Sequence, residues 1–400
     1  MHLSHIFFHR HSSAIRSSAS AKRAVRLLIL SAGILVGTVA SPAEETASRA
    51  ALKPAAVLGI MESVADWQLA HPSSHPPADW TQATGYAGMM ALARISENPR
   101  YRDAMVAMGE RNEWKLGPVF YLADDHAVGQ AYAELYLMLG DPRMIAPLRE
   151  RFDAILARPY SVPTLEYHPD NPDRKYAWTW CDALFMSPPA WMRLYAATKD
   201  RRYMDFAITN WLRTSDYLYE EREHLFFRDS SYFAQREANG KKIMWGRGNG
   251  WVMAGLARVL EYVPPDHPDR GRLVQQFQQT AARLVECQQP DGMWRASLLD
   301  PGSYPLKETS GSGLLTYALA WGVNHGLLDR EQFLPAVAKA WAALVDSVKP
   351  DGKLTHVQPI GSSPKDFDPD STDVYGTGAF LLAGSEVYRL AHQTAVAKPQ

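Results

Sequence analysis

The sequence has almost no cysteine: Cys181 and Cys287 are the only two among 400 residues. Two cysteines provide neither a disulfide framework nor a cysteine-based metal site, and no set of other metal ligands stands at a fitting spacing. An excess of one charge is also missing, because 42 lysines and arginines face 43 aspartates and glutamates. Without a basic excess there is no global field to attract nucleic acid. The sequence therefore predicts no metal site and no nucleic-acid partner.

Long apolar runs are scarce, and the one near the start of the chain is short. Residues 27–40 are uncharged, follow Arg16, Lys22, Arg23 and Arg26, and end in small residues. A membrane span needs about 20 apolar residues, whereas a basic segment, a short apolar core and small residues are typical of a secretory signal peptide. We expect a signal peptide over 1–40, a linker over 41–54, and export to the periplasm or the medium. No membrane contact is expected once the signal is removed.

Convincing alternating strands are few, and helical periodicity dominates from residue 55 onward. Apolar residues recur at three- and four-residue steps, which is the pattern of a helix with one buried face. The expected helices cover residues 55–68, 84–97, 101–111, 126–140, 143–156, 183–198, 202–218, 250–263, 270–288, 311–326, 331–347 and 376–392. The sequence therefore predicts an all-α protein with a single catalytic domain over 55–395.

The second half of the chain repeats. Glycine pairs at 248–250, 311–313 and 376–378 each open a helical stretch, and Pro-Asp-Gly turns at 290–292 and 350–352 each follow one. The repeating unit is thus a helical hairpin of about 60 residues. Six such units closed into a ring would bury every apolar face, whereas an open stack would expose both ends. We predict an (α/α)6 barrel, with an open α-solenoid as the alternative.

Residues suited to chemistry stand just before the predicted inner helices, which would gather them at one end of a barrel. These segments are Asp124-Asp125-His126, Trp178-Thr179-Trp180-Cys181-Asp182, Phe227-Arg228-Asp229, Trp245-Gly246-Arg247-Gly248-Asn249-Gly250-Trp251 and Glu308-Thr309-Ser310-Gly311-Ser312-Gly313. The sequence predicts that they form one site.

Asp182 is the strongest candidate for a catalytic acid. It lies between Trp180 and the apolar run that begins at Leu184. Apolar surroundings desolvate a carboxyl group and raise its pKa, which suits a general acid near neutral pH. The alternative is that Asp182 simply caps the helix that follows, since Asp is a favoured N-cap residue.

The pair Asp124-Asp125 also precedes a helix. One of these residues could cap that helix, and the other could be a second catalytic carboxylate or bind sugar hydroxyls. His126 alone is more often a structural hydrogen-bonding residue than a catalyst. The order of the two aspartates does not decide between them.

Arg247 stands in a glycine-rich segment between Trp245 and Trp251. Glycine allows a ligand to approach the backbone, a guanidinium binds carboxylates in a bidentate manner, and indole rings can stack on a sugar. A turn flanked by core tryptophans is the alternative. The segment does not bind phosphate in the manner of a P-loop, because no Lys-Ser or Lys-Thr follows it.

Together these motifs resemble those of the unsaturated glucuronyl and rhamnogalacturonyl hydrolases of glycoside hydrolase families 88 and 105, the second more closely. The resemblance runs from about residue 80 to 392 and is most specific at 180–186, 245–251 and 308–313, the last after Asp291-Gly292-Met293-Trp294. It implies an (α/α)6 barrel, a small unsaturated oligosaccharide as substrate, and no cofactor. It also implies hydration of the C4=C5 double bond of a terminal uronic acid, and we expect the oligosaccharide to derive from rhamnogalacturonan or pectin.

The resemblance assigns roles to individual residues. Asp182 matches the catalytic Asp of the family, and the second Asp falls in the 124–125 pair, where we favour Asp125. The remaining substrate-binding candidates are Trp178, Trp180, Trp245, Arg247, Asn249, Trp251, His126 and Glu308. Arg228 departs from the pattern, because members often have His in that loop, and it could supply a second contact to the substrate carboxylate.

Two other functions remain compatible with the residues. A conventional inverting glycosidase would use Asp125 and Asp182 as a pair of carboxyl groups about 6.5–9.5 Å apart. A non-catalytic exported glycan-binding protein would use the aromatic and Arg247 segments for binding alone.

Overall fold

The computed structural model describes residues 52–168 and 170–396. The predicted signal peptide, and the predicted linker up to residue 51, lie outside the described residues. Within them, no helix is long and apolar enough to cross a membrane.

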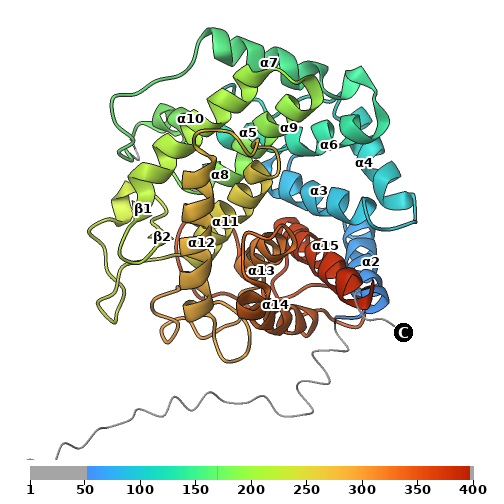
Figure 1. Ribbon diagram of the computed structural model, residues 1–400, viewed down its shortest axis with the longest axis vertical. Helices are drawn as coiled ribbons and strands as arrows, with labels where there is room; N and C mark the ends of the chain where they lie inside the picture. Colours follow the sequence, from blue (N-terminus) through green and yellow to red (C-terminus); the bar gives the residue numbers. More distant parts are fainter. Residues whose placement is uncertain (1–51, 169, 397–400) are drawn as a thin grey trace, which may run out of the picture. The chain divides into compact units, whose positions relative to one another are not determined.

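Twelve long helices alternate along the described chain between an outer and an inner position (Figure 1). The outer helices are α2 (Pro54–Ala70), α4 (Arg100–Arg111), α7 (Ala146–Ala157), α10 (Arg201–Leu218), α12 (Arg270–Cys287) and α14 (Arg330–Val345). The inner helices are α3 (Trp80–Ala93), α6 (Gly129–Leu139), α9 (Pro188–Thr198), α11 (Gly246–Leu260), α13 (Thr309–Asn324) and α15 (Val374–Val396).

Shorter elements fill some of the connections. They are the single-turn helices α5 (Ala123–His126) and α8 (Ala183–Met186), the 3-10 helices η1 (Pro142–Met144), η2 (Pro172–Ala177) and η3 (Ser230–Tyr232), and the strands β1 (Tyr219–Glu220) and β2 (Leu225–Phe226). The two strands pair antiparallel, with Tyr219 opposite Phe226.

The inner helices form a closed ring. Each contacts the next in the order α3, α6, α9, α11, α13 and α15, and α15 contacts α3. This closure confirms the (α/α)6 barrel and excludes the open solenoid. The burial pattern explains the two positions: α11 is buried at every residue, whereas α12 buries a single face. A helix that is apolar all round belongs inside, and an amphipathic helix belongs at the surface.

The glycine pairs lie in the first turns of the inner helices, which begin two to four residues earlier than expected. Helix α11 begins at Gly246, not at residue 250, and α15 begins at Val374. These glycines lie where neighbouring inner helices touch: a Cβ on Gly88 would stand 2.5 Å from the carbonyl oxygen of Gly378. The repeat therefore reflects close packing within the barrel ring.

This close packing predicts opposite effects for two Gly→Ala changes. Gly88→Ala should lower the free energy of unfolding by about 1–3 kcal/mol, because the added methyl forces α3 away from α15. Gly59→Ala in α2 has nothing within 4 Å of the new Cβ, so it should raise stability by up to about 1 kcal/mol. Urea denaturation measures both. Equal effects of the two changes would contradict the proposed contact.

Candidate active site

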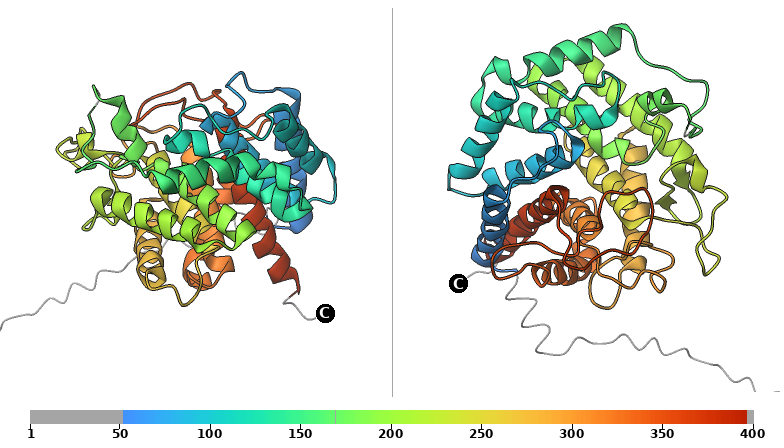
Figure 2. Two further views of the ribbon diagram at one scale, coloured as in Figure 1. Left: turned by 90° about the horizontal axis from the view of Figure 1, so that it is seen from above. Right: turned by 180° about the vertical axis from the view of Figure 1, so that it is seen from behind.

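The segments that precede the inner helices meet at the N-terminal ends of those helices, as the sequence predicts. The backbone N–H of Cys181 donates to the carbonyl of Arg228 at 2.8 Å. The Asn249 side chain binds both backbone groups of Phe226, at 2.8 and 3.1 Å. The connection between α14 and α15, residues 346–373, crosses this end of the ring (Figure 2) and is held by Arg247, which bonds the Gln358 carbonyl.

The Asp182 carboxylate is not used to cap a helix. It occupies the N-cap position of α8, but its side chain makes no capping hydrogen bond. The carboxylate is 13% exposed and accepts from the Cys181 thiol at 3.2 Å. Burial raises its pKa, while the charge of Arg228 opposes that rise. The side chain of Asp182 therefore does not cap α8, and its role as a general acid stays a prediction.

Arg228 lies beside Asp182 with an unused donor. Its Nη1 donates to Asp229 at 2.6 Å, and its Nε stands 4.0 Å from Asp182 Oδ1. That Nε is buried and has no hydrogen-bond partner among the described residues. The guanidinium also lies 6.0 Å from the ring centre of Tyr167. A buried donor without a partner costs free energy, so this group is suited to receive a ligand acceptor.

The structure separates the roles of Asp124 and Asp125. Asp125 is turned into the protein, where its carboxylate accepts from the N–H of Val119 at 2.5 Å. Asp124 has no such partner, and burial together with the charge of Asp182 raises its pKa to about 7. Asp124 is thus the carboxyl group that is electrostatically coupled to Asp182. This corrects the preference for Asp125, whose role here is to hold the 117–119 segment.

Arg247 is held by the segment that crosses this end of the ring, but its buried Nε has no hydrogen-bond partner among the described residues. Its contact with a substrate carboxylate stays a prediction. The residue is 1% exposed. Its Nη1 donates to the Gln358 carbonyl at 2.5 Å and its Nη2 to the Pro359 carbonyl at 2.9 Å. The guanidinium also lies between the rings of Trp245 and Tyr375, at 4.6 and 5.1 Å. Arg247 therefore holds the crossing segment in place, and its charge lowers the pKa of Asp182.

Other predicted substrate-binding side chains also lie beneath the site. Glu308 caps α13 by accepting from Ser310 and Gly311. His126 bonds Ser187 and Phe120, and burial lowers its pKa to about 4. Each of the following is at most 5% exposed: Asn249, Trp178, Trp180, Trp245 and Trp251. These side chains are thus buried in the described structure, and their contact with substrate stays a prediction.

Two aromatic residues near these segments, Trp80 and Tyr167, were missed by the sequence analysis. Trp80 begins α3, is partly exposed, and lies against Trp251 and Tyr375 with ring centres 5.9 and 5.2 Å apart. Tyr167 comes from the long connection between α7 and η2. The Asp79-Trp80-Thr81 sequence carried a signal for Trp80, since Asp79 caps α3 through the N–H of Thr81. Nothing local marked Tyr167.

The arrangement supports proton transfer. Across the described ranges, no group of three or more His, Cys, Asp or Glu residues could hold a metal ion. Both cysteines are buried and unpaired. The site offers two carboxyl groups with raised pKa values and a free guanidinium donor. Such a set can donate a proton, accept one and bind an anionic group.

Comparison with known proteins identifies the family of this chain. The sequence profile described as Glycosyl Hydrolase Family 88 matches residues 58–391. An unsaturated 3S-rhamnoglycuronyl hydrolase of Formosa agariphila is 37% identical over 386 residues, covering 91% of this chain and 98% of that protein. A glycosyl hydrolase family 88 structure from Bacteroides vulgatus is 31% identical with a TM-score of 0.75, covering 84% of this chain and 99% of the other.

A second structure, described as a polysaccharide lyase, is 33% identical with a TM-score of 0.77, over 87% of this chain and 99% of the other. The profile covers nearly the whole described chain, residues 58–391. The protein belongs to glycosyl hydrolase family 88.

Proposed function

We propose that this enzyme removes a 4,5-unsaturated uronic acid from the non-reducing end of oligosaccharides produced by polysaccharide lyases. The observation that carries the proposal is the juxtaposition of Asp182, free of any capping bond, with the unpartnered Nε of Arg228 at 4.0 Å. A uronic acid supplies the carboxylate that such a donor requires. The name of the Formosa agariphila relative supports the same substrate class.

The chemistry begins with protonation of a vinyl ether. Asp182 donates its proton to C4, and the positive charge that develops is shared between C5 and the ring oxygen. The Asp182 carboxylate then accepts a proton from the water that adds to C5. The resulting hemiketal opens, C1 becomes an aldehyde, and the next sugar leaves with its glycosidic oxygen. One water is consumed and Asp182 ends protonated, as it began.

Substrate binding places the proton on Asp182. In the free enzyme, burial raises the pKa values of both Asp182 and Asp124, that of Asp124 to about 7. The charge of Arg228 opposes the rise in both. The substrate carboxylate would neutralise Arg228 and remove this effect from its neighbour Asp182. The same loss of charge would also raise the pKa of Asp124, which Arg228 lowers in the free enzyme. The substrate thereby prepares its own acid.

Ultraviolet absorbance of the conjugated double bond tests the proposal. Loss of absorbance is expected with an unsaturated disaccharide, and a panel with rhamnose, glucose or N-acetylhexosamine as the next sugar identifies the leaving group. A polysaccharide lyase would instead create double bonds, so absorbance would rise with intact polysaccharide. Such a rise, or no loss across the whole panel, would contradict the proposal. Rhamnose is the expected leaving sugar.

Arg228 variants should separate substrate binding from pKa control. Since the guanidinium lowers both pKa values, Arg228→Met should raise them and move the alkaline fall of kcat/KM to higher pH. Loss of a charged hydrogen bond of about 1.5–3 kcal/mol should also raise KM about 10- to 100-fold. Arg228→Lys keeps the charge, so it should raise KM and leave the pH profile in place. Identical pH profiles for wild type and Arg228→Met would contradict this role.

We infer that the enzyme is exported, since the basic and apolar residues before position 41 have the composition of a signal peptide. Expression of the full chain in a Gram-negative host, followed by mass determination of the periplasmic protein, tests this. A product that begins near residue 41 is expected. Full-length protein confined to the cytoplasm would contradict it.

A further inference from the structure

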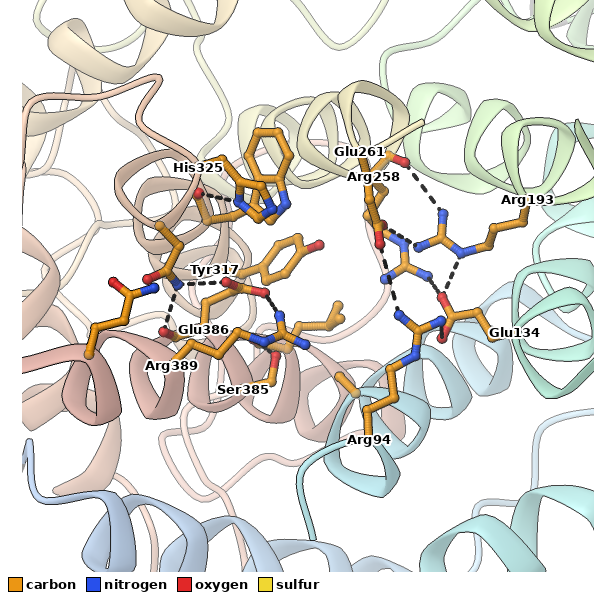
Figure 3. A pocket seen from close by; sticks show the side chains of 15 residues that line it. Arg94, Glu134, Arg193, Arg258, Glu261, Tyr317, His325, Ser385, Glu386 and Arg389 are labelled. Carbon is orange, nitrogen blue, oxygen red and sulfur yellow. Dashed lines mark hydrogen bonds and ion pairs between the residues drawn. The ribbon is translucent and has the colours of Figure 1, made fainter. Parts of the chain in front are cut away.

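A polar cavity lies at the opposite end of the barrel from Asp182. It has a volume of about 320 Å³ and is lined by residues at or near the C-terminal ends of α3, α6, α9, α11, α13 and α15 (Figure 3). The proposed reaction uses none of these residues. The cavity therefore needs its own explanation.

One wall of this cavity carries a surplus of positive charge. Glu134 accepts from Arg193 Nε at 2.5 Å and from Arg258 Nη2 at 2.6 Å. Arg94 stands farther away, 3.6 Å from Glu134 and 3.9 Å from Glu261. Three guanidiniums thus face two carboxylates. Arg94 is 27% exposed and, among the described residues, its guanidinium has only these two long contacts, so it is the cation available to an incoming anion.

The facing wall supplies hydrogen-bond acceptors. Glu386, which is 2% exposed, is held by Arg389 and by the side chain of Asn324 at 2.7 Å. The amide oxygen of Asn324 is buried and has no partner among the described residues. A carboxylate oxygen and an amide oxygen accept hydrogen bonds from hydroxyl groups. This wall is suited to a ligand with several hydroxyls.

Tyr317 joins the two walls. The residue is 4% exposed, and its hydroxyl points into the space between the Glu386 side and the Arg258 side (Figure 3). No hydrogen bond of this hydroxyl is found within residues 52–168 and 170–396. Buried tyrosine hydroxyls usually have a partner, and this one is open to the cavity, where a ligand could supply it. Trp321, stacked on His325 at 4.3 Å, adds an aromatic surface to the lining.

We propose that this cavity binds a sugar acid of one ring, with its carboxylate toward Arg94 and its hydroxyls toward Glu386, Asn324 and Tyr317. A volume of about 320 Å³ is at the lower end for small-molecule sites, so a longer oligosaccharide does not fit inside. A simple anion would leave the acceptor wall unused, and a neutral sugar would leave Arg94 unused. The proposal does not depend on the reaction at Asp182.

Calorimetric titration of the whole protein with glucuronate, glucose and sulfate tests the site. Glucuronate should bind, whereas glucose and sulfate should bind at least about 10-fold more weakly. Arg94→Gln should weaken glucuronate binding about 10-fold or more, and Tyr317→Phe about 2- to 10-fold. Tyr388→Phe is the matched control, because this half-buried tyrosine of α15 does not line the cavity. It should bind as the wild type does.

The variants also separate the cavity from the active site, which would itself bind a uronate. Turnover of an unsaturated disaccharide should keep its kcat and KM in both cavity variants, and circular dichroism should confirm that they fold. Three results would overturn the proposal: no glucuronate binding in the wild type, unchanged binding in both folded variants, or equally tight binding of sulfate or glucose. In each case the proposed function at Asp182 would stand unaffected.

Discussion

Asp182→Asn is expected to lower kcat on an unsaturated disaccharide by about 10²- to 10⁴-fold, the usual contribution of a positioned general acid or base. Asparagine has nearly the same shape, so the contacts with Cys181 and Arg228 lose charge but not volume. It can neither protonate C4 nor accept a proton from water. The initial rate of absorbance loss measures the effect.

Asp266→Asn is the matched control, because Asp266 is exposed in the connection between α11 and α12. It should turn over as the wild type does. Near wild-type rates in Asp182→Asn would contradict the assignment and move the acid role to Asp124. Loss of turnover in Asp182→Asn with retained binding would also exclude a purely glycan-binding protein.

Glu134→Gln is expected to give the largest loss of stability, about 3–5 kcal/mol, because it leaves buried cations without their partner. Arg193 is 1% exposed and Arg258 is 3% exposed, and both donate to Glu134 Oε1. The cost follows from the uncompensated charge. Urea denaturation at pH 7 measures it.

The pH dependence of this effect has a definite sign. The three arginines hold the pKa of Glu134 well below its usual range, although burial acts against them. A carboxyl group with a lowered folded pKa contributes stability above its unfolded pKa and loses it as the pH falls through the folded value. The wild type should therefore keep its advantage over Glu134→Gln throughout the neutral range.

Glu113→Gln provides the comparison, since Glu113 pairs with Lys115 at the surface and its side chain is 72% exposed. Exposed pairs contribute little, so its denaturation midpoint should stay near that of the wild type. Equal midpoints for Glu134→Gln and Glu113→Gln would show that the buried cluster does not stabilise the barrel as argued.

The ring of helical hairpins could be predicted because the spacing of apolar residues along a helix reflects which of its faces is buried. The three- and four-residue steps and the spacing of the glycine pairs were both local signals. The reason for the glycines was not local: Gly88 and Gly378 face each other across α3 and α15. The inner helices were expected to start at these glycines, but they begin two to four residues earlier. The glycines lie within the helices and allow neighbouring helices to touch.

The segments that form the site could be predicted from the sequence, but the burial of their side chains could not. Asp182 could be identified because its apolar neighbours are adjacent in sequence. The burial of Arg247, Glu308 and Asn249 could not be predicted, because it depends on segments far away in the sequence. The Gln358 carbonyl, which accepts a hydrogen bond from Arg247, is an example. Likewise, the choice between Asp124 and Asp125 depends on the N–H of Val119.

Proton NMR in deuterated water tests the central claim, which is that hydration of the double bond precedes release of the sugar. With the unsaturated disaccharide, we predict loss of the C4 vinyl signal and entry of deuterium at C4. The amount of second sugar released should never exceed the amount of vinyl signal lost. A disaccharide with a saturated uronic acid should remain intact. Release of the second sugar while the vinyl signal persists, or cleavage of the saturated disaccharide, would contradict the account.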